Sequence, residues 1–341
     1  MKRAGMAELA KEAGVSIATI DRALNGREAV RQDTRSLILA AALRIGHPAA
    51  GRLANPMADL PDVRFGVVLH KQGQDFYKAF AEELHRAVAA APNVRGRLIL
   101  EFSTSQAPSE MAGHLRSMAG RCDVLAATAV NHPEVTAAVE DLAAQGLSVF
   151  TLLSDFAQGA RSGYLGLNNL KVGRTAGWAM ALAAKGPGVT AIFVGGHRWH
   201  GHELRETGFR AYLRECAPHL TVLDPLVNLE TRQLTYETTL TLLARQPNLR
   251  GIYVAGGGME GAIAALREAR PAGDLAMVVS ALTADSRAGL AEGLVTLVTD
   301  TPLEKLCRDL FGVMTRAVTE GTPQGGIQYF LPPDIHVAET I

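Results

Sequence analysis

Two kinds of hydrophobic pattern divide this chain near residue 63. Before that point, apolar residues recur at helical spacing in short segments, which predicts helices over residues 6–13, 17–25 and 34–45. After it, continuous runs of Val, Ile and Leu alternate with amphipathic segments. Such runs are typical of parallel strands that helices cover on both faces. We therefore expect a small helical head followed by a large α/β body.

The predicted helices of the head are joined by residues suited to a tight turn. Gly14 stands where the first helix would end in a left-handed conformation, and Ser16 is placed to cap the second helix. Within the second helix, Ile20 and Leu24 fall on one side and would face a core. The opposite side carries Ala18, Arg22 and Asn25. Three short helices with a glycine turn between the first two form a helix-turn-helix.

Several apolar runs of the body have the length and composition of buried strands. They cover residues 64–70, 97–103, 123–130, 147–153, 189–196, 250–257 and 275–281. Because these runs and their helices are too many for one sheet, we expect two lobes, with the chain crossing between them near residues 165 and 300. The predicted fold class is α/β, with a three-helix helix-turn-helix head and a two-lobed, doubly wound parallel-sheet body.

The expected domain boundaries follow from these patterns. The head occupies residues 1–46, and a linker rich in proline and small residues occupies 47–62. The body is expected to span 63–341. One lobe would contain 63–164 and 300–327, and the other 165–299 and 328–341.

Charge, cysteine and hydropathy narrow the classes of function. Lys+Arg and Asp+Glu are both 34, yet residues 1–52 hold nine basic and five acidic residues, which favours a polyanion partner at the head. The three cysteines lie far apart, without metal-knuckle or disulfide spacing. The first residues carry no apolar signal core, and no run approaches the length of a membrane span. We expect a cytoplasmic protein without a cofactor.

A string of small, turn-forming and capping residues runs through the head. It consists of Leu9-Ala10, Ala13-Gly14-Val15-Ser16, Thr19, Arg22, Leu24-Asn25-Gly26, Val30 and Thr34-Arg35. This string resembles the DNA-binding domain of the lactose/galactose-repressor (LacI/GalR) family, and the rest of the chain resembles that family's effector domain, a type I periplasmic-binding-protein fold. The resemblance implies a transcriptional repressor that binds a near-palindromic DNA operator as a homodimer. A small metabolite, a sugar or sugar derivative, would control operator affinity from a site between two lobes.

The resemblance also implies roles in DNA binding. Arg22 is able to make a bidentate contact to guanine, whereas Ile17 and Ala18 offer only apolar contacts, for instance to a thymine methyl group. The positions that the family uses on phosphates carry Ser16, Thr19, Asn25 and Thr34.

The linker leaves two interpretations open. The family's hinge is a short helix that wedges a leucine into the minor groove, and Leu53 in AAGRLAN is the candidate wedge here. Pro48 and Pro56 flank the segment, and proline and glycine both disfavour a helix. The alternative is an unstructured tether.

Ligands of parallel sheets bind beyond the carboxyl ends of the strands. The loops that follow the predicted strands carry the polar candidates Gln74, Asn131 and Asp155. The resemblance implies that Phe76, with Tyr77 as the alternative, stacks on the ligand. It also implies that Arg205, in an Arg-x-x-Gly-Phe motif, reaches ligand oxygens.

Two of these loops lack an expected polar group. Gly257-Gly258 and Ala281-Leu282 stand where the family often has Asp or Asn. Because carboxylates are the natural acceptors for sugar hydroxyls, their absence argues against a simple neutral sugar as the ligand. The histidines and Trp199 of GHRWHGH are the candidate replacements.

Other chemistries have weaker support. His197, His200 and His202 do not share one helix face, and no carboxylate or thiolate completes a tetrahedral site nearby, so we expect no metal. The GGGME segment lacks the Lys-Ser/Thr of a phosphate-binding P-loop. The alternative function is a solute-binding protein or an enzyme of the same build. An enzyme would have to combine Asp155, His132 and Ser154, and we expect no catalytic residues.

Overall fold

The computed structural model describes residues 5–25, 30–54, 60–322 and 326–341. By their internal contacts, the residues form two compact units. One contains Met1–Val63 and Ala91–Arg97, and the other contains Arg64–Ala90 and Leu98–Ile341. The helices of the first unit are called the head below, and the second unit is called the body.

The described part of the head contains helices α1 (Met6–Ala13), α2 (Ile17–Asn25), α3 (Gln32–Arg44) and α4 (Ala49–Ala54). The turn between α1 and α2 is the predicted one, since Gly14 has φ 66° and the Val15 amide donates to the Ala10 carbonyl at 3.1 Å. Ser16 caps α2, because the Thr19 amide donates to its Oγ at 3.1 Å. The helices enclose a small apolar core, and the predicted helix-turn-helix is confirmed.

The candidate hinge segment is helical over α4 and packs into the head. The Leu53 side chain is 4 % exposed and belongs to the same apolar cluster as Leu9, Ile20 and Ile38. Over these residues the segment is therefore helical and not an unstructured tether. In this structure Leu53 is a core residue of the head, because burial removes this apolar side chain from water, and its minor-groove contact stays a prediction.

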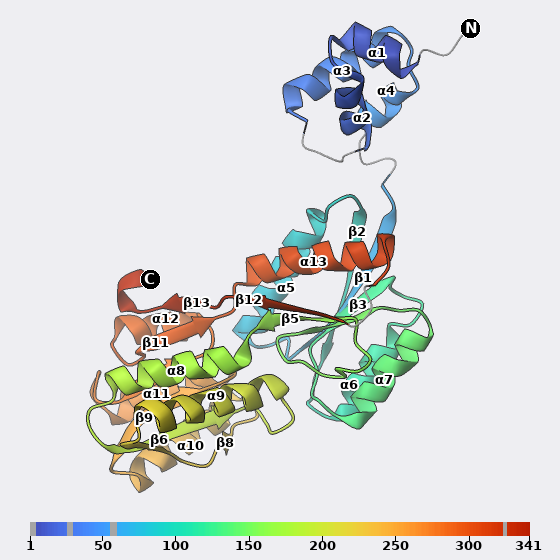
Figure 1. Cartoon of the computed structure of the whole chain (residues 1–341). Coiled ribbons are helices and arrows are strands. Elements are labelled where there is room, and N and C mark those ends of the chain that lie inside the picture. The colour runs from blue at the N-terminus through green and yellow to red at the C-terminus, as the bar shows by residue number, and fades with distance from the viewer. Residues whose placement is uncertain (1–4, 26–29, 55–59, 323–325) are drawn as a thin grey trace. The chain divides into compact units, whose positions relative to one another are not determined.

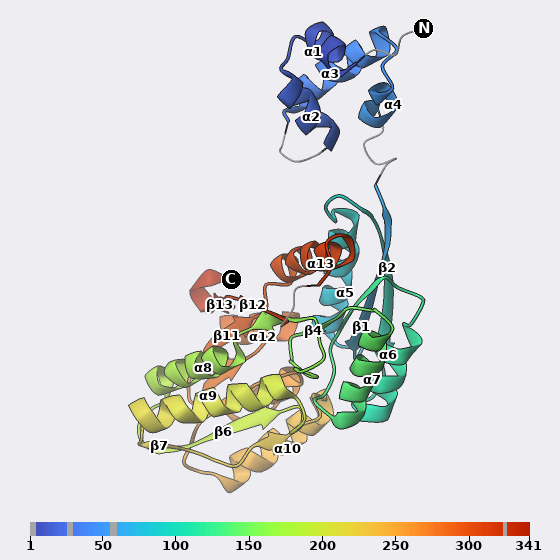
Figure 2. The ribbon, with the colours of Figure 1, turned by 45° about the vertical axis from the view of Figure 1, so that its right-hand side comes forward.

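The first sheet of the body contains β1 (Asp62–His70), β2 (Arg95–Ser103), β3 (Val124–Ala127), β4 (Val149–Leu152), β5 (Gly163–Leu167) and β12 (Ile327–Leu331). Within the described residues, their order is β12-β5-β4-β3-β1-β2. The pairs from β1 to β12 through β3, β4 and β5 are parallel. Helices α5 (Asp75–Ala89) and α13 (Leu303–Thr319) cover one face, and α6 (Pro108–Ser117) and α7 (Pro133–Ala144) cover the other (Figures 1 and 2). Both β3 and β4 are buried throughout, which explains their unbroken apolar runs.

The second sheet contains β6 (Gly188–Val194), β7 (Leu220–Val222), β8 (Leu226–Val227), β9 (Leu249–Val254), β10 (Ala276–Val279), β11 (Leu297–Asp300) and β13 (Asp334–His336). Among the described residues, the order is β13-β11-β10-β9-β6-β7, with β8 also paired to β6. The β13 strand runs antiparallel to β11. Helices α8 (Asn169–Ala183) and α9 (His200–Cys216) cover one face, and α10 (Arg232–Arg245), α11 (Met259–Ala269) and α12 (Ala284–Ala291) cover the other. A short 3-10 helix, Ala338–Thr340, follows β13.

The two-lobed, parallel-sheet body is confirmed, and each lobe is one sheet with its covering helices. The crossings between lobes come slightly later than expected. β5 keeps the chain in the first lobe until Leu167, and β12 does so until Leu331, beyond the expected boundaries at 164 and 327. The reason is that β12 pairs with β5 along its whole length, a long-range contact that periodicity does not reveal. No helix in the described ranges is both long and apolar enough to cross a bilayer.

Candidate functional site

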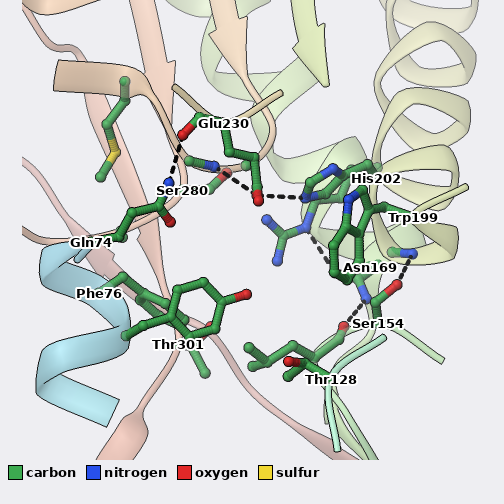
Figure 3. Close-up of a pocket in the computed structure, with 18 of the residues that line it drawn as sticks. Gln74, Phe76, Thr128, Ser154, Asn169, Trp199, His202, Glu230, Ser280 and Thr301 are labelled. Carbon is green, nitrogen blue, oxygen red and sulfur yellow. Dashed lines mark hydrogen bonds and ion pairs between the residues drawn. The ribbon is translucent and has the colours of Figure 1, made fainter. Parts of the chain in front are cut away.

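A cavity in the body lies at the carboxyl ends of strands from both sheets (Figure 3). From the first lobe it is lined by Gln74, Phe76, Tyr77, Thr128 and Ser154. From the second lobe it is lined by Asn169, Trp199, His202, Arg205, Glu230 and Ser280. In the first sheet β1 lies between β3 and β2, and in the second sheet β6 lies between β9 and β7. The strand order therefore reverses direction at β1 and at β6, and such a reversal opens a crevice at the carboxyl ends of the strands. The predicted ligand residues Gln74, Phe76, Tyr77 and Arg205 are among the lining residues.

Arg205, on α9, is held in place by neutral acceptors. Its Nε donates to Asn169 Oδ1, and its Nη1 donates to the Ala255 carbonyl, both at 2.7 Å. Asn169 is itself fixed, since its Nδ2 donates to the Leu153 carbonyl at 3.0 Å. Neither acceptor of the guanidinium is a carboxylate, so these bonds orient the charge without neutralising it.

Glycines bring α8 close enough to α9 for the Asn169–Arg205 bond. A Cβ on Gly173 would overlap the carbonyl oxygen of Arg205, and a Cβ on Gly208 would overlap the carbonyl oxygen of Leu170. A larger residue at either position would force the two helices apart. The glycine of the Arg-x-x-Gly-Phe motif therefore sets the helix spacing that positions the arginine.

A buried carboxylate forms another part of the cavity wall. Glu230 is 7 % exposed and follows the short strand β8. Its Oε1 accepts from the Gly257 amide at 3.1 Å and lies 3.7 Å from Nε2 of His202, and its Oε2 lies 3.9 Å from Nε2 of His70. Figure 3 shows the Glu230 carboxylate extending toward His202.

Burial controls the protonation of this group of residues. It lowers the pKa of His70 to about 4 and that of His202 to about 4, so both imidazoles are neutral near pH 7. Burial alone would raise the pKa of Glu230, yet the net pKa lies below its ordinary value because His202, Lys71 and His70 surround the carboxylate. The cavity wall therefore combines the ionised carboxylate of Glu230 with the Arg205 guanidinium and the neutral imidazole of His202. Glu260 also lines it, and burial raises the pKa of that carboxyl group.

Two hydrogen bonds join the lobes beside the cavity. Lys71 Nζ donates to the Leu229 carbonyl, and Gln74 Nε2 donates to the Glu230 carbonyl at 2.5 Å. Lys71, Leu229 and Glu230 all have positive φ, at 48°, 49° and 54°. Non-glycine residues adopt this conformation at a cost of about 1–2 kcal/mol each, and such strain concentrates at functional sites.

Each lobe also contributes an aromatic residue to the apolar packing of the other. Phe76 follows β1 in the first lobe, and its ring packs against the second-lobe cluster that contains Met259. Trp199 follows β6 in the second lobe, is 4 % exposed, and packs into the first-lobe cluster that contains Phe156. The Trp199 Nε1 donates to Gln106 Oε1 at 3.0 Å. The structure is thus a closed form of the body, with side chains from each lobe buried against the other.

Two predicted ligand residues do not line the cavity. Asp155 is 7 % exposed, and its carboxylate accepts from Nε and Nη2 of Arg161 at 2.5 and 2.8 Å. A buried carboxylate needs a partner, and Arg161 is that partner within the first lobe. Asn131 is exposed, and its main-chain N–H donates to the Arg198 main-chain carbonyl at 2.8 Å. Neither residue lines the cavity in this structure, and a ligand contact by either one stays a prediction.

The residues considered for catalysis or metal binding have separate partners. His132 Nδ1 accepts from the Glu134 amide at 3.3 Å, and Ser154 Oγ accepts from the Gly201 amide at 3.0 Å. Neither of these bonds joins Asp155, His132 and Ser154 to one another. Among the residues that the structure describes, no group of three His, Cys, Asp or Glu side chains is arranged to hold a metal ion.

Sequence reasoning missed Asn169 and Glu230 because it missed the strands before them. Asn169 follows β5, whose sequence GYLGL is short and rich in glycine, and Glu230 follows β8, which has only two residues. Short strands give weak periodic signals. The rule that polar residues at strand ends line the cleft would have found both residues once these strands were recognised.

In the head, the predicted DNA-contacting residues lie at the exposed side of α2 and near it. Ile17 is 51 % exposed, Ser16, Ala18 and Arg22 are exposed, and Thr19 and Thr34 are half-buried. On the opposite side of α2, Ile20 and Ala23 are buried in the head core. Asn25 ends α2, and its side chain lies outside the described part of the chain. The helix thus turns its predicted contact face away from the core.

Two family models match this chain. The model described as bacterial regulatory proteins, lacI family, matches residues 5–47, and the model described as a periplasmic binding protein domain matches residues 65–306. The chain belongs to the LacI/GalR family. As a LacI/GalR-family protein, it joins a helix-turn-helix DNA-binding head to a body of the periplasmic-binding-protein type.

Solved structures of sugar-binding proteins resemble the body of this LacI/GalR-family chain. A solute-binding protein from Burkholderia graminis in complex with D-arabinose is 18 % identical with a TM-score of 0.74, covering 83 % of this chain and 98 % of that one. One from Agrobacterium vitis with bound D-fucose is 14 % identical with a TM-score of 0.74, covering 82 % and 96 %. A sugar-binding transporter component from Bacillus halodurans is 18 % identical with a TM-score of 0.71, covering 81 % and 98 %. These likenesses show the fold of the body. No curated protein matches the chain.

Proposed function

We propose that this LacI/GalR-family protein is a cytoplasmic transcriptional repressor that binds its operator as a homodimer. A sugar or sugar derivative bound in the cavity of the body controls its affinity for the operator. The observation that carries the proposal is the cavity itself, which is lined by strand ends of two lobes in a chain that also has a helix-turn-helix head. A ligand that binds between lobes favours their closed arrangement, which couples its binding to a second site.

The head recognises DNA through α2. Arg22 reads guanine, Ile17 and Ala18 contact base edges through apolar groups, and the polar residues around them hold phosphates. Those polar residues are Ser16, Thr19, Asn25 and Thr34. The exposure of Ile17 and Arg22 on the side of α2 opposite the core supports this assignment.

The body holds the effector between aromatic and charged groups. Phe76 and Tyr77 supply apolar contact from the first lobe, Arg205 supplies a charged donor from the second, and Gln74 lies at the junction of the two. The solved relatives named above bind sugars, which supports a ligand of that class here.

Fluorescence anisotropy with DNA from upstream of the protein's own coding sequence tests the proposal. The protein is expected to bind a near-palindromic segment of that DNA in preference to a scrambled one, and D-arabinose, D-fucose, D-allose or a related sugar is expected to change the affinity. Equal binding to both DNAs would favour the alternative, a solute-binding protein or enzyme of the same build. A thermal-shift screen of sugars, polyols and sugar acids identifies the ligand, since a compound that binds only the folded state raises the melting temperature.

A further inference from the structure

The loops that carry no acidic residue enclose a carboxylate from elsewhere. Gly256 and Gly257 follow β9, and the Gly257 amide donates to Glu230 Oε1 at 3.1 Å. Glu230 comes from the turn between β8 and α10, and its side chain thus lies at the end of β9. The loop after β9 has no carboxylate of its own at Gly257-Gly258, but the turn between β8 and α10 places the Glu230 carboxylate beside it in the cavity.

The glycines make room for this side chain. A Cβ on Gly256 would lie 2.9 Å from Glu230 Oε1 and 2.5 Å from His202 Cε1, and a Cβ on Gly195 would lie 2.6 Å from Glu230 Cγ. Cβ atoms in proteins essentially never lie this close to other atoms, so Glu230 and His202 would have to shift if a side chain replaced the glycine at 195 or 256. The glycines after β6 and β9 thus leave the space that the Glu230 side chain occupies.

The carboxylate is incompletely satisfied. Glu230 Oε2 has no hydrogen-bond partner among the described residues, and His70, at 3.9 Å, is too distant to donate to it. Its neighbours are the imidazoles of His70 and His202, the ammonium of Lys71, whose Nζ donates to the Leu229 carbonyl, and the Gly257 amide. A buried charged carboxylate with so few donors is costly, and a ligand hydroxyl that donates to it from the cavity binds more tightly for that reason.

Arg205 and Glu230 together define the charge of the effector. One is a cation held by neutral acceptors and the other an ionised carboxylate. Glu260 lines the same cavity, and burial raises the pKa of its carboxyl group, which favours the uncharged form. A ligand anion would face Glu230, and a ligand cation would face Arg205. A hydroxyl group both accepts and donates, so adjacent hydroxyls satisfy Arg205 and Glu230 at once.

Resting on the proposed function, we propose that Glu230 is the specificity-determining acceptor for hydroxyl groups of the effector, and that the effector is an uncharged sugar or polyol. Sugar acids and sugar phosphates are excluded by the same carboxylate. This reverses the expectation drawn from Gly257-Gly258 and Ala281-Leu282, because the acceptor comes from position 230 instead.

Isothermal titration of the full-length protein with compounds matched in shape but different in charge tests this inference. The probes are D-galactose, D-galacturonate and D-galactosamine, with D-arabinose and D-arabinonate, and D-allose and D-allonate, as further sets. The parent protein is expected to bind at least one neutral member at least 100-fold more tightly than its acid. Glu230→Gln keeps the shape of the side chain and is expected to lower that affinity at least tenfold. The control Glu237→Gln, at an exposed position on α10, is expected to leave it unchanged.

The outcomes separate this inference from the proposed function. If the parent binds an acid or the amino sugar more tightly than the neutral sugar, the assignment of an uncharged effector is overturned. If Glu230→Gln binds the neutral sugar as tightly as the parent, the role of Glu230 is overturned. In both cases the proposed sugar-responsive regulator still stands. If the parent binds none of the probes but still binds its operator, the sugar effector itself is refuted, and this inference with it. A thermal melt without ligand checks that Glu230→Gln folds. If it does not, Glu230→Asp, which keeps the charge but withdraws the oxygens, is expected to show the tenfold loss.

Discussion

Gln74 ties the first lobe to the second by donating from Nε2 to the main-chain carbonyl of Glu230 at 2.5 Å. The acceptor is the residue whose carboxylate lines the cavity, so one bond links lobe closure to the position of the proposed ligand contact. Glu230 has a φ of 54°, and the bond helps to hold this unfavourable backbone.

Gln74→Ala is expected to loosen closure and weaken effector binding. Loss of one hydrogen bond is worth about 1 kcal/mol, which corresponds to a roughly fivefold weaker affinity. Calorimetric titration of the variant with the effector found by the screen measures this affinity. Gln72→Ala, at an exposed neighbouring position, is the matched control and is expected to bind like the parent. Parental affinity in Gln74→Ala would show that the bond does not contribute to closure.

Gly208→Ala is expected to separate α8 from α9. Its Cβ would overlap the Leu170 carbonyl oxygen, and backbone shifts of this kind cost about 1–3 kcal/mol of unfolding free energy. Effector affinity is expected to fall as well, because the Asn169–Arg205 bond depends on the helix spacing. Urea unfolding measures the first effect. The control is Gly113→Ala on α6, where a Cβ meets nothing within 4 Å and unfolding free energy should not fall. A Gly208→Ala variant as stable as the control would contradict the packing argument.

Acid is expected to destabilise the closed body. Burial lowers the pKa of both His70 and His202 to about 4, from an ordinary value of 6.5. A base with a lowered pKa in the folded state contributes stability that is present above pH 6.5 and is lost as pH falls toward 4. Each histidine adds at most about 1.4 kcal/mol per pH unit to this slope. Melting temperatures measured from pH 7 to pH 4 should fall, and His70→Gln should flatten the curve.

The exposed His85 supplies the control for this experiment, because His85→Gln should leave the pH dependence unchanged. A parental slope in His70→Gln would mean that other groups set the acid sensitivity of the body.

Leu53→Ala is expected to destabilise the head in the absence of DNA. The side chain is 4 % exposed, and removal of a buried leucine costs about 2 kcal/mol or more. Calorimetry of the DNA-free protein measures the head transition, with Leu43→Ala, at a position 63 % exposed, as the control of small effect. If only DNA bending changes in Leu53→Ala and the melt does not, the leucine acts as a wedge and not as a core residue.

Arg22→Ala is expected to reduce specific DNA binding selectively. Loss of a bidentate guanine contact costs about 1–3 kcal/mol on the operator, whereas binding to random DNA depends mainly on phosphate contacts and should change little. Anisotropy titrations with operator and scrambled DNA at one fixed salt concentration measure both affinities. A uniform loss on the two DNAs would assign Arg22 to the phosphate backbone.

Local sequence determined the head and much of the body. The turn at Gly14 and the cap at Ser16 act within a few residues, so the helix-turn-helix is readable from its own segment. The long strands of the body are readable because burial on both faces requires continuous apolar runs. Phe76 and Arg205 were predictable as cavity residues because parallel sheets place strand ends at one edge, and family resemblance pointed to the same two residues.

Only the tertiary structure decided which polar residues face the cavity. Asp155 and Glu230 are both acidic residues in loops, yet Arg161 pairs with the first, whereas the second lies among glycines that follow β6 and β9. The same holds for Leu53, whose burial depends on α4 packing against the head core. These outcomes depend on contacts between segments distant in sequence, and the free energy of a charged or apolar side chain is set by the neighbours that such contacts bring to it.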